Sequence, residues 1–132
     1  MLQPKIYVKD KKKVYDTQFI DYKNKRVTFF DSETQWTYTR SFDEVEFMEN
    51  TGFKDKYGDD VYVGDIVKVE IENETYFEVV KKEKNYSAFT LEDENSCVLF
   101  TIDDGQFLET VGNIYENKGL VEIDKTNQKA DI

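Results

Sequence analysis

The stretch Val61-Tyr62-Val63-Gly64-Asp65-Ile66-Val67-Lys68-Val69 decides the fold of this 132-residue chain. Glycine adopts a positive φ without steric cost, so Gly64 suits the end of a type II turn. After the turn, apolar and polar side chains alternate, which predicts a strand with Val67, Val69 and Ile71 on its inward face. The stretch therefore predicts a tight turn that opens a β-sheet.

The residues that follow continue as short alternating runs separated by Asn, Asp and Gly, a pattern that predicts β-strands. We expect four further strands, near residues 75–81, 87–91, 97–102 and 107–115. Five short antiparallel strands opened by a Gly-Asp turn are typical of a small SH3-like barrel. Upstream, Asp55-Lys56-Tyr57-Gly58 predicts a type I turn in which Gly58 is the left-handed residue.

The N-terminal part of the chain predicts a separate antiparallel sheet. We expect its strands near residues 6–9, 14–22, 25–30, 35–40 and 46–50. Asn24 suits the left-handed position of the first tight turn, and residues 31–33 make the second. Residues 41–44 read Ser-Phe-Asp-Glu, which matches a capping box and predicts one helical turn.

Trp36 is the only tryptophan in the chain. It shares one face of its expected strand with Tyr38, because side chains alternate along a strand. We therefore expect Trp36 and Tyr38 to pack against Val27 and Phe29 across the hairpin. A role for Trp36 as a ligand platform is the alternative.

The composition changes near Thr51 and Gly52. Residues 1–50 carry 9 basic and 9 acidic side chains, whereas residues 51–132 carry 9 and 19, so the net charge of −10 lies wholly in the second part. We take this shift as a lobe boundary. The chain is thus predicted to be mainly β, with an N-terminal antiparallel β-sheet lobe (1–50), an SH3-like small β-barrel lobe (51–120) and a polar C-terminal tail (121–132).

Composition also excludes several classes of chemistry. The chain has no histidine and one cysteine, so a Cys/His zinc site, an internal disulfide and a His general base are ruled out. Cys97 lies in an apolar run that favours a buried, inert thiol over a reactive one. No apolar run is long enough to span a bilayer, and residues 1–5 lack the apolar core of a signal peptide. We expect a cytoplasmic protein with no cofactor, no metal and no catalytic residues.

Four charged segments have a binding interpretation beside a structural one. The pairs Asp59-Asp60 and Asp103-Asp104 are candidate magnesium ligands, but both fall in expected turns, where aspartates commonly bond backbone N–H groups. Glu92-Asp93-Glu94 lacks the ligand spacing of a calcium loop. The basic run Lys9 to Lys13 is either a solvated turn or a patch for an acidic partner.

Two longer motifs resemble a known family. Residues 47–67 read FMENTGFKDKYGDDVYVGDIV and residues 111–117 read VGNIYEN. Together, in this order, they resemble the signature of YopX-like proteins, and residues 5–16 resemble the family's opening strand pair. Tyr57 departs from the family pattern, which usually has Asn before the glycine. The resemblance implies a protein of bacteriophages and prophages, made in the cytoplasm of the bacterial host, and it brings no catalytic residues.

The motif residues that combine special backbone positions with polar groups are candidate binding residues. They are Thr51, Gly52, Tyr62, Gly64, Asp65, Asn113, Tyr115 and Asn117. The competing interpretation is structural, because Asp65 and Asn113 can accept hydrogen bonds from turn amides while Tyr62 and Tyr115 pack.

We expect a non-catalytic accessory protein that acts by protein–protein interaction with an unidentified host or phage partner, or with further copies of itself. Ten Phe, nine Tyr and one Trp exceed what one small core needs. The alternative is an acidic nucleic-acid mimic that inhibits a host DNA-binding enzyme. A metal-dependent hydrolase is less favoured because the chain has no histidine. A nucleic-acid-binding module is less favoured because the surface is acidic, and no membrane partner is expected.

Overall fold

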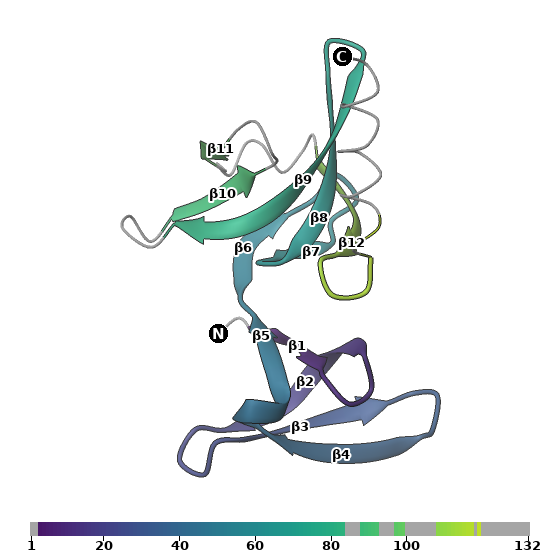
Figure 1. Cartoon of the computed structure of the whole chain (residues 1–132), viewed down its shortest axis with the longest axis vertical. Helices are drawn as coiled ribbons and strands as arrows, with labels where there is room; N and C mark the ends of the chain where they lie inside the picture. Colours follow the sequence, from purple (N-terminus) through teal and green to yellow (C-terminus); the bar gives the residue numbers. More distant parts are fainter. Residues whose placement is uncertain (1–2, 84–87, 93–96, 100–107, 118, 120–132) are drawn as a thin grey trace. The chain divides into compact units, whose positions relative to one another are not determined.

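Antiparallel β-strands make up nearly all the regular structure in the computed structural model, which describes residues 3–83, 88–92, 97–99, 108–117 and 119 (Figure 1). The chain divides into two units, Met1–Asn50 (unit 1) and Thr51–Ile132 (unit 2). The prediction of a mainly β chain is therefore confirmed. The predicted tail at 121–132 lies outside the described residues.

Unit 1 holds a five-stranded sheet in the order β4-β3-β2-β1-β5. Its strands are β1 (Lys5–Val8), β2 (Lys13–Asp21), β3 (Arg26–Asp31), β4 (Trp36–Ser41) and β5 (Val45–Met48). All neighbours run antiparallel, and the pairing of β2 with β3 shifts register between Thr17 and Phe19. A bulge of this kind bends a strand, so β2 changes direction between its two partners.

The core of unit 1 comes from alternate residues of β1 and β3 and from the first residue of β5. Its buried members are Ile6, Val8, Val27, Phe29 and Val45. Tyr38 stacks on Phe29 with ring centroids 5.7 Å apart, as the sequence predicted. The prediction for Trp36 is wrong, because Trp36 pairs with Asp31 at the end of the hairpin and 68% of its surface is exposed.

The turns of unit 1 use polar side chains. Asn24 was expected in the left-handed position, but Lys25 occupies it, with φ 56°. The reason is that Asn24 donates its backbone N–H and its side-chain amide to Asp21, at 3.0 and 2.8 Å. The capping box is confirmed: Ser41 donates its backbone N–H to Glu44 Oε1 at 3.0 Å, and the 3-10 turn η1 (Phe42–Glu44) follows.

Unit 2 holds a second five-stranded antiparallel sheet, in the order β11-β10-β9-β8-β12, and the two-stranded sheet β6-β7. Its strands are β6 (Asn50–Lys54), β7 (Asp60–Tyr62), β8 (Asp65–Ile71), β9 (Glu74–Glu83), β10 (Ala88–Glu92), β11 (Cys97–Leu99) and β12 (Leu108–Asn113). The β6-β7 hairpin was not predicted from the sequence. The described strands do not form a closed barrel.

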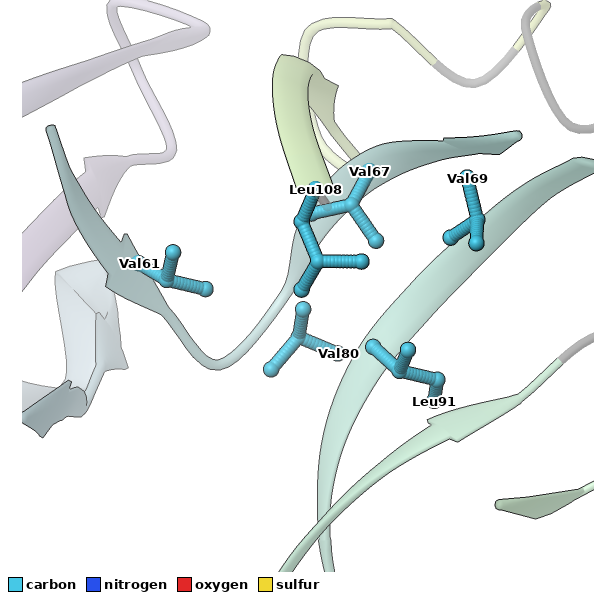
Figure 2. Packing of buried hydrophobic residues seen from close by; sticks show 6 residues of the cluster. All are labelled: Val61, Val67, Val69, Val80, Leu91 and Leu108. Atoms are coloured by element: carbon cyan, nitrogen blue, oxygen red, sulfur yellow. The ribbon is translucent and has the colours of Figure 1, made fainter. Parts of the chain in front are cut away.

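The core of unit 2 gathers side chains from β7, β8, β9, β10 and β12, and Figure 2 shows how they lie. They are Val61, Val67, Val69, Val80, Leu91 and Leu108. Val67 and Val69 face inward as the alternation predicted, while the side chain of Ile71 lies outside the described residues. Gly58 and Gly64 both have positive φ, 85° and 98°, which confirms the left-handed positions expected of them.

The exposure of Trp36 can be tested by comparing its substitution with that of Phe29, a core residue of the same unit. We expect Trp36→Phe to change the free energy of unfolding by less than about 0.5 kcal/mol, because the side chain is exposed. Phe29→Ala should lower it by about 3–5 kcal/mol, because it empties a fully buried site. Urea unfolding followed by circular dichroism measures both, and comparable losses for the two variants would contradict the placement of Trp36.

Candidate functional site

All eight candidate residues lie in unit 2. Thr51 and Gly52 lie on β6, while Tyr62, Gly64 and Asp65 lie around the turn that joins β7 to β8. Asn113, Tyr115 and Asn117 lie at the end of β12 and just after it. The second and third groups are adjacent, because Asp65 pairs with Asn113 in the ladder between β8 and β12.

The turn between β7 and β8 is held from both sides. Gly64 donates its N–H to the carbonyl of Val80 on β9 at 2.8 Å, and its own carbonyl accepts the N–H of Ile114 at 2.9 Å. Asp65 is 5% exposed, and its Oδ2 accepts the N–H of Tyr62 at 2.8 Å. Gly64 thus fastens the turn to the segments on either side of β8.

Asn113 organises the turn that follows β12. Its Oδ1 accepts the backbone N–H groups of Tyr115 and Glu116 at 3.0 and 2.8 Å, and its Nδ2 donates to Glu116 Oε1 at 3.0 Å. Asn117 Oδ1 accepts the N–H of Asn113 at 3.1 Å. A Cβ at Gly112 would lie 2.5 Å from that Asn117 oxygen, so glycine leaves the room that this contact needs.

Thr51 joins the two strands of the small sheet. It is 8% exposed, and its Oγ1 donates to the carbonyl of Val61 at 2.7 Å and accepts the N–H of Phe53 at 3.1 Å. Gly52 has φ 83°, a conformation that favours glycine. These contacts, like those of Gly64 and Asn113, bind the chain's own backbone.

The acidic candidates do not converge in the described part of unit 2. Asp59 is exposed, and Asp60 pairs with Lys54 at 2.6 Å. Among the described residues, no three His, Cys, Asp or Glu side chains are grouped to hold a metal ion. Asp103-Asp104, Asp93, Glu94 and the side chain of Cys97 lie outside the described residues.

Asp55 is a structural carboxylate that the sequence analysis did not single out. It is 6% exposed. Its Oδ1 accepts the N–H groups of Tyr57 and Asp59, both at 3.0 Å, and its Oδ2 accepts the N–H of Thr110 on β12 at 3.2 Å. Asp55 therefore closes its own turn and fastens that turn to β12. In the sequence, the position of Asp55 three residues before Gly58 is the feature that could have indicated its role in closing this turn.

Replacing Asp55 should destabilise unit 2. In Asp55→Asn one side-chain oxygen becomes an N–H₂ donor, which cannot accept the bond from Thr110, so we expect a loss of about 1–3 kcal/mol. Asp59→Asn is the matched control, because it removes the same charge from an exposed side chain of the same turn. Thermal unfolding followed by circular dichroism measures both variants, and equal midpoints would show that Asp55 does not fasten the turn.

In unit 1 the buried carboxylate of Asp31 binds Lys11 of the basic run and the nearby Tyr15. Asp31 is 3% exposed; its Oδ1 accepts the N–H of Glu33 at 2.9 Å, and its Oδ2 accepts Lys11 Nζ and the Tyr15 hydroxyl, both at 3.3 Å. Burial by itself raises the pKa of Asp31, but the Glu33 N–H and the Lys11 ammonium outweigh it and the pKa is lowered. Lys11 Nζ also lies 3.8 Å from the ring centroid of Tyr38.

The basic run is a turn, as expected, but three of its lysines, Lys9, Lys11 and Lys13, bind groups within unit 1. Lys9 donates to the Asp43 carbonyl at 3.0 Å, and Lys13 pairs with Glu33 at 2.5 Å. Next to the run, Arg40 binds both oxygens of Asp10 at 3.0 Å. The hydrogen bond from this guanidinium lowers the pKa of Asp10.

The lowered pKa of Asp31 predicts a pH dependence. Ionised Asp31 contributes stability that is fully present above the unfolded pKa, about 4, and is lost as the pH falls through the lower folded pKa. Asp31→Asn should therefore destabilise unit 1 at neutral pH and weaken the loss of stability in acid. Urea unfolding over a pH series measures this, with Asp16→Asn as an exposed control. If the free energy of unfolding of Asp31→Asn falls with pH as steeply as that of the intact chain, ionised Asp31 does not contribute to stability.

The fold and these contacts define a two-unit, all-β protein whose turns are closed by buried Asp, Asn and Thr side chains. The family model described as YopX protein matches residues 5–122, and the chain belongs to the YopX protein family. The resemblance seen in the two motifs is thereby confirmed and extends to the strands of unit 1.

One solved structure with the same fold is the crystal structure of protein EF1440 from Enterococcus faecalis. The two share 16% sequence identity at a TM-score of 0.62, over 90% of this chain and 96% of that one. At this identity the likeness shows the fold alone. No curated protein matches the chain. Within the described residues, no helix is long and apolar enough to cross a membrane.

Proposed function

We propose that the chain is a non-catalytic accessory protein of a phage or prophage that binds another protein in the cytoplasm of the bacterial host. The observation that carries this proposal is the exposure of Phe19 and Phe30, at 62% and 41%, on the solvent side of the β2-β3-β4 sheet. We name this side of unit 1 the outer face.

The strand register defines the outer face. Phe19 pairs with Thr28, and Phe30 pairs with Thr37. Paired residues point to the same side of a sheet, and neighbouring residues point to opposite sides. Phe19 and Phe30 therefore share the side opposite to the core residue Phe29, so their exposed rings stand on one surface.

A groove adjoins this surface. It is open, measures about 400 Å³, and runs along β2 and the end of β3. Its lining residues are Lys13, Val14, Tyr15, Asp16, Gln18, Phe30 and Ser32. Protein interfaces typically combine exposed aromatic rings with a polar rim, and Phe30 with the polar residues around it fits that description.

Charge supports the choice of unit 1. Residues 1–50 carry equal numbers of basic and acidic side chains, 9 of each, so no net charge repels an approaching protein surface. In the same proposal the eight motif residues have a structural role, because the hydrogen bonds of Thr51, Gly64 and Asn113 fix the positions of backbone groups. We keep the expectation that the chain has no catalytic residue, cofactor or metal.

We also infer that unit 2 is an SH3-like barrel. Two features support it: the five antiparallel strands around β8, and the small β6-β7 sheet whose Val61 belongs to the same core as Val80 and Leu108. The bonds of Gly64 to β9 and to the segment after β12 draw those segments toward one turn.

A second candidate function rests on charge. Residues 51–132 carry 19 acidic against 9 basic side chains, the charge that a nucleic-acid mimic would present to a host DNA-binding enzyme. Contacts of that kind weaken as added salt screens them, whereas burial of Phe19 and Phe30 does not.

Affinity capture from phage-infected cells tests the binding proposal. We expect the intact chain to retain one or more host or phage proteins, and Phe19→Ser/Phe30→Ser to lose them, because an aromatic anchor is worth about 2 kcal/mol or more at an interface. Quantitative mass spectrometry of the retained proteins provides the measurement.

Tyr57→Ser is the control, since Tyr57 is a comparably exposed aromatic residue (67%) on unit 2. It should retain the same proteins. Retention by the double Phe variant would contradict the role of the outer face, and elution by salt from all variants alike would favour the acidic mimic instead.

A further inference from the structure

One edge of the unit 1 sheet is open. In the order β4-β3-β2-β1-β5, β4 is bonded only to β3, and no described residue pairs with its other side. Open edges are usually protected by charged side chains, above all lysine, by proline or by a bulge. β4 reads Trp-Thr-Tyr-Thr-Arg-Ser, has a regular register and contains no lysine or proline, and Arg40 is its one charged residue.

The hydrogen-bond pattern shows which residues of β4 face outward. Phe42 donates its N–H to the carbonyl of Lys25 at 3.0 Å, so Lys25 and Phe42 form a hydrogen-bonded pair. Hydrogen-bonded and non-bonded pairs alternate along an antiparallel ladder. Tyr38 with Phe29 is then a bonded pair, and the N–H and C=O groups of Thr37 and Thr39 point away from β3.

Two side-chain contacts agree with this assignment. The hydroxyls of Thr39 and Thr28 lie 3.0 Å apart, and such closeness is typical of a non-bonded pair. Arg40 Nη1 donates to the carbonyl of Thr39 at 3.1 Å, which requires that this carbonyl be directed away from the ladder. The next outward N–H, that of Ser41, is already bound to Glu44 in the capping box.

We propose that β4 pairs with β4 of a second copy of this chain, with Thr37 bonded to Thr39 of the second copy and Tyr38 opposite Tyr38. The geometry selects this register. An antiparallel pair of identical strands that continues one sheet has a two-fold axis perpendicular to the sheet, so bonded partners are both outward-facing residues. The capping box leaves the outward N–H groups of Thr37 and Thr39 available, and the Thr39 carbonyl has a second lone pair beside the one that Arg40 binds.

The side chains suit a second copy. In this register the exposed Trp36 lies opposite Arg40 of the second copy, a pair that can form a cation–π contact. Unit 1 has no net charge, so electrostatic repulsion does not oppose the approach of unit 1 of a second copy. Thr37 and Thr39 point to the outer face, so the pairing joins two outer faces into one larger surface. The proposed dimer goes beyond the proposed partner binding and does not depend on it.

Charge placed on the two threonines tests the register. In Thr37→Lys/Thr39→Lys each new lysine faces a lysine of the other copy, and two such like-charge pairs should raise the dimer dissociation constant about tenfold or more. In Thr37→Lys/Thr39→Glu the same positions face opposite charges, so the dimer should return. Sedimentation velocity of the purified full chain over a wide concentration range gives the dissociation constants.

The expected result is a concentration-dependent dimer of the intact chain, its loss in the Lys/Lys variant and its recovery in the Lys/Glu variant. Trp36 emission should shift to shorter wavelength as the intact chain associates. A monomer at every concentration, a dimer that persists in the Lys/Lys variant, or a Lys/Glu variant that stays monomeric would each overturn the proposal. Phe19→Ser/Phe30→Ser should still dimerise, so loss of captured proteins and loss of the dimer are separate outcomes.

Discussion

Closure of turns by buried polar side chains is the constraint on which both units depend. Short strands bury few side chains each, so the sheets hold together only if the chain between strands is fixed, and backbone N–H groups left unpaired in a buried turn are costly. Asp31 in unit 1 and Asp55, Asp65 and Asn113 in unit 2 each accept backbone N–H groups at such places. The same residues therefore satisfy the turns and set which strands can meet.

This constraint gives several of the motif residues a structural role. Asp65 accepts the Tyr62 N–H, and Asn113 accepts two further amides, so a substitution at either position changes the backbone of a turn first. A polar motif around glycines resembles a ligand loop in sequence, because both need positive φ and hydrogen-bonding side chains. In unit 2 the acceptors face the chain's own amides, and the exposed aromatic side chains Phe19 and Phe30 lie in unit 1.

Local patterns predicted most of the strands and two left-handed glycines, because alternation and positive φ are properties of neighbouring residues; they did not predict the β6-β7 hairpin. Val67, Val69, Gly58 and Gly64 were placed correctly for that reason. Contacts between distant segments were not predictable: Asp55 reaches Thr110 across 55 positions, and no periodicity encodes that distance. Trp36 was misplaced because alternation gives the face of a residue but not whether the sheet extends far enough to cover it.

The two units differ in net charge and in the apolar side chains that they expose. Unit 2 carries the whole net charge, and like-charged surfaces repel one another most strongly at low salt. Unit 1 has no net charge, exposes Phe19, Phe30 and Trp36, and has the open edge strand β4. The open edge and the exposed aromatic side chains therefore lie on the unit without net charge, where electrostatic repulsion opposes the approach of another protein least.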